Sequence, residues 1–96
     1  MEMSIQDYKG AIHLDPQLAL AYNNRGNAYK DLGQYQKAIQ DYNEAIRLDP
    51  QLALAYNNRG NAYKCLGQYQ KAIEDHNEAI GLDPQLALAY NNPGNA

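Results

Sequence analysis

The segment Leu14–Arg47, LDPQLALAYNNRGNAYKDLGQYQKAIQDYNEAIR, is followed at once by a near copy of itself, residues 48–81. The two copies are identical at 30 of 34 positions. They differ at four pairs of positions: Asp31 and Cys65, Gln40 and Glu74, Tyr42 and His76, and Arg47 and Gly81. Repetition at this period indicates an array of small units, in which each unit buries its apolar face only against its neighbours.

Partial copies of the unit flank the two complete ones. Residues 82–96 repeat the first 15 residues of the unit with one change, Pro93 in place of arginine, and residues 5–14 match residues 39–48 at seven of ten positions. We therefore expect one repeat array over residues 1–96. The expected divisions are the second helix of an incomplete repeat (1–14), two repeats (15–48 and 49–82) and the first helix of an incomplete repeat (83–96).

Composition narrows the class of function. The formal net charge is −3 and the lysines and arginines are scattered, which argues against a nucleic-acid or anionic-membrane surface. The chain has no apolar run of membrane-spanning length and no signal-peptide pattern, so a cytoplasmic location is the default expectation. The single cysteine, Cys65, excludes an intramolecular disulfide framework and a multi-cysteine metal site.

The recurring residues that start and end helices predict about six helices and no strands. The dipeptide Asp-Pro recurs at 15–16, 49–50 and 83–84, where it should end one helix and start the next. In the first complete unit we expect helices over about 16–31 and 35–48, with Gly33 ending the first in a left-handed turn. The connection is short enough to make the two helices antiparallel.

The apolar spacing shows how the two helices of a unit should pack. Tyr22, Gly26 and Tyr29 fall on one side of the first helix at 100° per residue. The second helix carries an inner face of six residues: Tyr35, Ala38, Ile39, Tyr42, Ala45 and Ile46. The small residues Gly26 and Ala38 mark where the backbones can approach most closely.

This pattern resembles the tetratricopeptide repeat, a helix-turn-helix unit of 34 residues. The residues that carry the resemblance are Tyr22, Gly26, Tyr29, Ala38, Tyr42, Ala45 and Pro50, with Tyr56, Gly60, Tyr63, Ala72, His76, Ala79 and Pro84 as their counterparts. The resemblance covers essentially the whole chain. It implies an all-α fold, a right-handed superhelical solenoid of antiparallel helix pairs.

The sequence departs from the family pattern at two kinds of position. Arg25 and Arg59 stand where the family usually has an aliphatic residue, and His76 replaces a packing aromatic. A charge on an apolar face needs a partner or a route to water. We expect structural ion pairs, with a snorkelling arginine as the alternative; the pairs are Arg25 with Asp41 and Arg59 with Asp75. His76 is expected to be a partly buried stand-in for tyrosine.

Catalytic chemistry has little support. Cys65, His13 and His76 lie in three different predicted helices, and catalysis needs a nucleophile or base held by an orienting partner. Metal-ligand spacing and a glycine-rich phosphate loop are both missing from the sequence. We expect a protein that is not an enzyme and takes no cofactor.

Asparagine is concentrated in the first helix of each unit, although it is a poor helix former. In the family, first helices line a concave groove, so the resemblance implies an amide-lined peptide site, because an amide both donates and accepts. The expected groove residues are Leu20, Asn23, Asn24, Asn27, Lys30, Asp31, Leu54, Asn57, Asn58, Asn61, Lys64, Cys65, Leu88, Asn91 and Asn92. The alternative is a solvated polar surface copied by duplication.

Two family groove types offer precedents. Asn24, Asn58 and Asn92 resemble the asparagine ladder in the repeats of the O-linked N-acetylglucosamine transferase. The carboxylate clamp, which holds the acidic C-terminus of heat-shock chaperones, is matched at two asparagines, Asn27 and Asn58. Its basic positions fall on Asn23, Leu88 and Asn92, and without cations a terminal carboxylate loses its strongest hydrogen bonds. The clamp is therefore disfavoured.

The partial units suggest self-association. Apolar residues there lack the neighbouring helix that a complete array would supply: Ile5, Tyr8, Ile12, Leu86 and Tyr90. Contact between the two ends of different chains would be head-to-tail, or a helix could be exchanged. Pro93 weakens the last helix and counts against this contact. A fragment of a longer array would have the same partial units.

The sequence thus predicts a non-catalytic scaffold that binds an extended peptide or a partner protein in its concave groove. The alternative is a self-assembling module whose partner is another copy of the chain. Neither prediction involves nucleic acid or a membrane.

Overall fold

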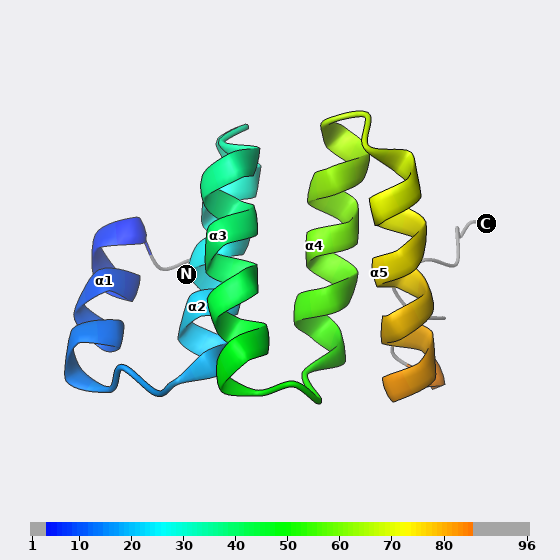
Figure 1. The fold of residues 1–96 in the computed structure, drawn as a ribbon. Coiled ribbons are helices and arrows are strands. Elements are labelled where there is room, and N and C mark those ends of the chain that lie inside the picture. The colour runs from blue at the N-terminus through cyan, green and yellow to red at the C-terminus, as the bar shows by residue number, and fades with distance from the viewer. Residues whose placement is uncertain (1–3, 86–96) are drawn as a thin grey trace.

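The computed structural model describes residues 4–85, which form five α-helices and no strand (Figure 1). Their bounds are α1 Ile5–Leu14, α2 Ala19–Asp31, α3 Tyr35–Leu48, α4 Ala53–Cys65 and α5 Tyr69–Leu82. The helices stand side by side in chain order, with α2 behind α3 and their axes alternating in direction (Figure 1). The prediction of an all-α helical solenoid is confirmed. Most of the expected sixth helix lies outside the described residues.

The helices α2 and α4 begin three residues later than the Asp-Pro pattern predicted. The Asp15 side chain accepts a hydrogen bond from the Gln17 amide at 3.1 Å, and the Asp15 carbonyl accepts one from the Leu18 amide at 3.1 Å. These bonds close a tight turn before the helix, and Leu18 is the N-cap, with an extended backbone (φ −84°, ψ 93°). The second unit repeats the turn at Asp49. Aspartate therefore stabilises the turn rather than the first amides of the helix.

The C-terminal ends of α2 and α4 follow the prediction. Gly33 and Gly67 have positive φ angles of 77° and 79°, which glycine adopts at low cost. At the first of these turns, the Gln34 amide donates to the Tyr29 carbonyl and the Gly33 amide to the Lys30 carbonyl, both at 2.9 Å. This pair of bonds satisfies carbonyls that the end of the helix would leave without a partner. It also turns the chain back so that α3 packs antiparallel to α2.

Within a repeat, the two helices meet where their side chains are smallest. Ala38 is completely buried, and a Cβ atom at Gly26 would lie 2.6 Å from Cε1 of Tyr42. The Tyr42 ring therefore occupies the space that glycine leaves open. Between repeats, Ile39 of α3 packs into a cluster with Ala62, and the half-buried Tyr63 lies against the same cluster.

The first helix is the most loosely held of the five. Ser4 caps it, because the Ser4 hydroxyl accepts from the Asp7 amide and the Asp7 carboxylate accepts from the Ser4 amide. None of its residues is buried, and Leu14 at its end is 85% exposed. The local capping bonds therefore define where α1 starts, while tertiary packing contributes little. None of the helices within residues 4–85 is long and apolar enough to cross a membrane.

Candidate functional site

The arginines that depart from the family pattern form two-bond ion pairs with the second helix of their own repeat. Arg25 donates from Nε and Nη2 to the Asp41 carboxylate at 2.8 and 2.7 Å. Arg59 and Asp75 have the same geometry at 2.8 and 2.7 Å. The Asp41 side chain is only 8% exposed, so its charge is largely removed from water. The hydrogen bonds to aspartate raise the pKa of both guanidinium groups.

Each arginine also lies between two tyrosine rings of its own helix. The Arg25 guanidinium carbon is 5.6 Å from the centre of the Tyr22 ring and 5.8 Å from that of Tyr29. Arg59 repeats the contact with its own pair of tyrosines. The flat guanidinium thus fills an aliphatic position by contacting ring faces, a favourable cation–π arrangement. The structure gives both arginines a structural role.

The asparagines of successive first helices are joined by hydrogen bonds. Asn58 of α4 donates from Nδ2 to Oδ1 of Asn23 in α2 at 3.1 Å, and Asn23 donates from Nδ2 to Oδ1 of Asn24 at 3.3 Å. The three amides therefore form a chain that links two repeats. Asn23 is 1% exposed and Asn58 is 6% exposed, so this network is internal.

The prediction that Asn23, Asn57 and Asn58 line a peptide groove therefore needs correction, because all three are buried. Asn57 is 0% exposed, and neither its side-chain oxygen nor its nitrogen has a hydrogen-bond partner among residues 4–85. Asn23 lies on the flank of α2 that faces the second repeat, and Asn57 has the corresponding position on α4. The residue that corresponds to the partner of Asn23 is Asn92, which lies outside the described residues. The amide side chains at this flank fill space between repeats instead of facing a groove.

A second amide ties the two helices of the first repeat together. The Tyr42 hydroxyl donates to Oδ1 of Asn27 at 2.5 Å. Tyr42 is 0% exposed, and burial raises the pKa of its hydroxyl. In the second repeat the tyrosine is replaced by His76, which is half-buried with its ring against Gly60. His76 therefore stands in the aromatic position, as the sequence indicates.

The remaining predicted groove residues form a partly exposed strip on α2 and α4. Five are exposed: Leu20, Asn24, Asp31, Lys64 and Cys65. Four are half-buried: Asn27, Lys30, Leu54 and Asn61. Leu88, Asn91 and Asn92 lie outside the described residues. The strip combines two leucines with amides, two lysines and one aspartate, so it offers apolar contact together with hydrogen-bond donors and acceptors.

The residues considered for catalysis have separate neighbours. Cys65 is an exposed thiol at the end of α4, and its hydrogen bond with Tyr35 of α3 raises the pKa of the Tyr35 hydroxyl. His76 contacts Gly60, and His13 is exposed near the end of α1.

The apolar residues predicted for self-association are only partly described. Ile5, Tyr8 and Ile12 of α1 are half-buried, whereas Leu86 and Tyr90 lie outside the described residues. The structure shows a larger apolar surface that sequence reasoning missed, on α5 at Tyr69 and Ile73. These side chains are 62% and 53% exposed. The signal was present in the sequence, because both residues copy positions that the next repeat covers in the first unit.

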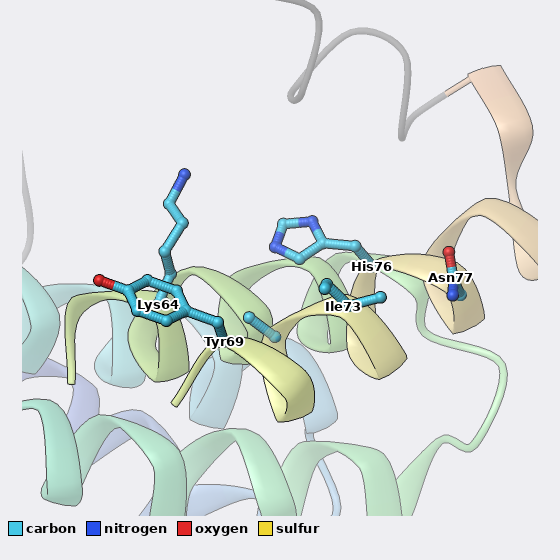
Figure 2. Close-up of a pocket in the computed structure, with 6 residues that line it drawn as sticks. Lys64, Tyr69, Ile73, His76 and Asn77 are labelled. Atoms are coloured by element: carbon cyan, nitrogen blue, oxygen red, sulfur yellow. The ribbon is translucent and has the colours of Figure 1, made fainter. Parts of the chain in front are cut away.

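A hollow of about 450 Å³ lies along this surface (Figure 2). It is lined by Lys64, Tyr69, Ala72, Ile73, His76 and Asn77. Figure 2 shows that all but Lys64 come from α5, and that Lys64 rises from the neighbouring helix beside Tyr69. Its walls are more apolar than polar, so it fits a packed side chain better than a small ion.

Antiparallel helix pairs that repeat every 34 residues and pack only on their neighbours define a helical repeat solenoid. Comparison with family profiles gives the family: TPR repeat profiles match residues 1–33 and 26–67, and the tetratricopeptide repeat profile matches residues 53–86. The chain belongs to the tetratricopeptide repeat family. The fold of this family is in general a non-catalytic, protein-interaction fold.

Solved structures agree with this assignment. The chain is 36% identical to the Arabidopsis OM64 TPR domain, with a TM-score of 0.82, covering 84% of this chain and 67% of that one. It is 30% identical to the first TPR of Spaghetti (RPAP3) bound to the HSP90 peptide SRMEEVD (TM-score 0.81; 83% and 64% covered). It is also 30% identical to MamA (TM-score 0.78; 86% and 48% covered). The chain thus spans about two thirds of the first two and half of the third. Comparison with curated proteins finds no significant match.

Proposed function

We propose that this chain is a non-catalytic scaffold that binds an extended peptide of a partner protein along the exposed strip of α2 and α4. The observation that carries the proposal is the fixed orientation of Asn24. Its Oδ1 accepts from the buried Asn23, and Nδ2 makes no hydrogen bond to any residue in 4–85. A held amide with an available NH₂ group suits a peptide carbonyl, whatever side chains the peptide carries.

Apolar contact on both helices supports the same proposal. Leu20, one turn before Asn24, is 47% exposed, and Leu54 is its half-buried counterpart on α4. Asn61 and the exposed Lys64 continue the strip toward the end of α4. Such a surface offers side-chain contacts at intervals with a polar contact between them, which suits an extended segment. The first TPR of Spaghetti, which has a similar fold, is bound to a peptide in its solved structure.

The carboxylate clamp remains disfavoured for this chain. Asn58 is 6% exposed and donates to Asn23, while Asn27 accepts from Tyr42, so two amides that would serve the clamp are already engaged. The position of its first cation is occupied by the buried Asn23. We therefore propose a groove that recognises the peptide backbone rather than a terminal carboxylate. The peptide SRMEEVD should bind with the same affinity whether its C-terminus is free or amidated. A tenfold or greater loss of affinity on amidation would indicate a carboxylate clamp instead.

The groove proposal is tested with a peptide selected from a displayed random library against the whole chain. Asn24→Ala should weaken that peptide by about 1–2 kcal/mol in calorimetry, because one hydrogen bond to the backbone is lost. Gln40→Ala is the matched control: it also removes an exposed amide, on α3, and the second repeat has glutamate there. Equal affinity of Asn24→Ala and the control would overturn the proposal. Asn58→Ala is unsuitable, since it also breaks the buried bond to Asn23.

Self-association is a second candidate function. The observation that favours it is the exposed apolar surface of α5, where Tyr69, Ile73 and Ile80 are each between 46% and 62% exposed. Contiguous exposed apolar residues often mark an interaction site. Light scattering over a concentration series tests this candidate, since a self-associating chain grows in mass with concentration and a peptide scaffold does not.

A further inference from the structure

Four residues form one stripe along the outer side of α5. They are spaced by four, four and three residues, so they lie on one face of the helix: Tyr69, Ile73, Asn77 and Ile80. All four are exposed. We call this stripe the outer face of α5. Three of its members are large and apolar or aromatic, so covering this face would remove apolar surface from water, which is favourable.

The first repeat shows what covers this face. The same stripe on α3 is Tyr35, Ile39, Asn43 and Ile46, and there it packs against α4. Ile39 is 7% exposed in the cluster with Ala62, whereas its copy Ile73 is 53% exposed. Asn43 accepts a hydrogen bond from Nη1 of Arg59 at 2.8 Å, across the boundary between repeats. The partner of this face is therefore a first helix with an arginine aimed at the asparagine.

α5 differs from α3 at three positions, none of which belongs to this stripe; one of them is Gly81, which replaces Arg47 near the end of the helix. Glu74 replaces Gln40 at an exposed position, and His76 replaces Tyr42 on the side that faces Gly60 of the same repeat. The outer face of α5 is thus identical in residue type to the face that α4 covers. A helix with the sequence of α4 would fit it without change.

Such a helix exists in every copy of the chain. Over its 13 residues α2 differs from α4 only at Asp31, which replaces Cys65. It presents Ala28, Tyr29, Leu32 and Arg25 where the second repeat has Ala62, Tyr63, Leu66 and Arg59. The groups that α4 and its C-cap place against α3 therefore have identical counterparts on α2 and its C-cap, except that Asp31 replaces Cys65, which hydrogen-bonds Tyr35 of α3.

In the monomer α2 is covered by α1, and this contact is less complementary than the contact of α3 with α4. Lys9 of α1 aligns with Asn43 of α3, so α1 carries a cation at the position where α3 offers Arg59 an acceptor. Nη1 of Arg25 makes no hydrogen bond to any described residue. Leu32 is 62% exposed, whereas its copy Leu66 is half-buried against the inter-repeat cluster. With no buried residue in α1, little packing is lost if α1 is displaced.

We propose that the outer face of α5 in one copy of the chain docks on α2 of a second copy, in place of that copy's α1. Asn77 then accepts from Nη1 of Arg25 of the second copy, and Ile73 packs against its Tyr29 and Leu32. The contact reproduces the interface between α3 and α4. It joins two different surfaces, so repetition builds an open chain or a ring. The proposal rests on the self-association put forward above and names its partner helix.

A segment of the same chain competes for this face. Residues 86–96 repeat most of the sequence of α2 but carry Pro93 where α2 has Arg25. This segment therefore lacks the arginine whose guanidinium would donate a hydrogen bond to Asn77. If residues 86–96 cover the outer face of α5, the chain should stay monomeric. The following experiment detects that outcome.

The test blocks each surface separately. Ile73→Asp and Leu32→Asp change side chains that are 53% and 62% exposed, so both variants should fold, with an unchanged circular dichroism spectrum. Each variant alone should be monomeric, because every copy in the solution has lost the same one of the two surfaces that must meet. Mixed in equal amounts, the two should form a 1:1 complex of twice the 10.8 kDa chain mass, through Arg25 of the Ile73→Asp chain's intact α2 and Asn77 of the Leu32→Asp chain's intact α5. Leu20→Asp, an exposed leucine of the groove strip, is the control and should associate like wild type.

The hydrogen bond is tested at Asn77, which is exposed. Asn77→Asp should tighten association about tenfold by placing a carboxylate beside Arg25, and Asn77→Lys should weaken it at least tenfold. A chain that is monomeric at about 1 mM overturns both self-association and this interface. Association that persists in the two blocking variants, or that ignores the charge at Asn77, overturns this interface alone and leaves self-association through another surface.

Discussion

The hydroxyl of Tyr42 donates a hydrogen bond of 2.5 Å to Oδ1 of Asn27, across the two helices of the first repeat. The ring of Tyr42 lies over Gly26, and the whole side chain is buried. One residue therefore fills the closest approach of α2 and α3 and also fixes an amide of the neighbouring helix. In the second repeat His76 packs on Gly60 instead, so the two repeats differ at their centres although their sequences are nearly the same.

Tyr42→Phe should destabilise the protein by about 1–2 kcal/mol. The ring and its packing are kept, but Oδ1 of Asn27 loses its donor in a partly buried position. The free energy of unfolding in urea measures the loss. Tyr69→Phe is the control, because that side chain is 62% exposed and the change should have little effect. Equal stability of the two variants would show that the hydrogen bond contributes nothing net.

The stability of the protein should fall in alkaline solution because of the same residue. Burial raises the pKa of the Tyr42 hydroxyl above its ordinary value of 10.0, with the charges of Asp31 and Asp41 adding to the shift. A raised pKa means that the contribution is complete below pH 10, where the unfolded chain also keeps its proton. It is lost as pH rises above 10, because only the unfolded chain can then ionise.

Urea unfolding between about pH 9 and pH 11 measures this effect. The free energy of unfolding of the wild type should decline by up to about 1.4 kcal/mol per pH unit above 10. Tyr42→Phe should decline less steeply, since the other eight tyrosines are present in both proteins. Parallel curves for the two proteins would mean that Tyr42 ionises in the folded state.

Much of the fold follows from the sequence because its signals are local. A glycine after a helical pattern predicted the left-handed turn at Gly33, and the small residues Gly26 and Ala38 predicted where the two helices of a repeat approach most closely. The start of α2 was wrong by three residues, because the Asp15 side chain caps the turn that precedes the helix. Propensity alone does not distinguish these two uses of the same aspartate.

The groove was harder to predict than the fold. Helical periodicity separates the side that packs on the partner helix from the opposite side, but it does not say which flank meets the next repeat. That flank depends on the rotation between repeats, and it turned out to carry Asn23 and Asn57, which are buried. The exposed stripe of α5 was overlooked for a related reason, since identical residues are buried in one repeat and exposed in the next.

Gly26→Ala should destabilise the protein by about 1–2 kcal/mol, although alanine is the better helix former by about 1 kcal/mol. The added Cβ would lie 2.6 Å from Cε1 of Tyr42, whose ring is buried and whose hydroxyl is held by Asn27. Gly10→Ala is the matched control in α1, where the new methyl group meets nothing within 4 Å. Thermal unfolding should show a lower midpoint for the first variant and an equal or higher midpoint for the second. A stabilised Gly26→Ala protein would mean that the ring moves aside at little cost.

The ion pair of Arg25 and Asp41 should prove costly to break but easy to replace. Arg25→Leu restores an aliphatic side chain, yet it leaves the Asp41 carboxylate, 8% exposed, without its two hydrogen bonds. We expect a loss of about 3 kcal/mol for this single change. The double variant Arg25→Leu with Asp41→Ala removes both charges and should recover to within about 1 kcal/mol of wild type, because desolvation of the two ions offsets most of their attraction. Urea unfolding of the two variants at pH 7 separates the outcomes: a neutral single change would contradict a buried charged carboxylate, and a double variant as unstable as the single one would show that the pair itself stabilises the repeat.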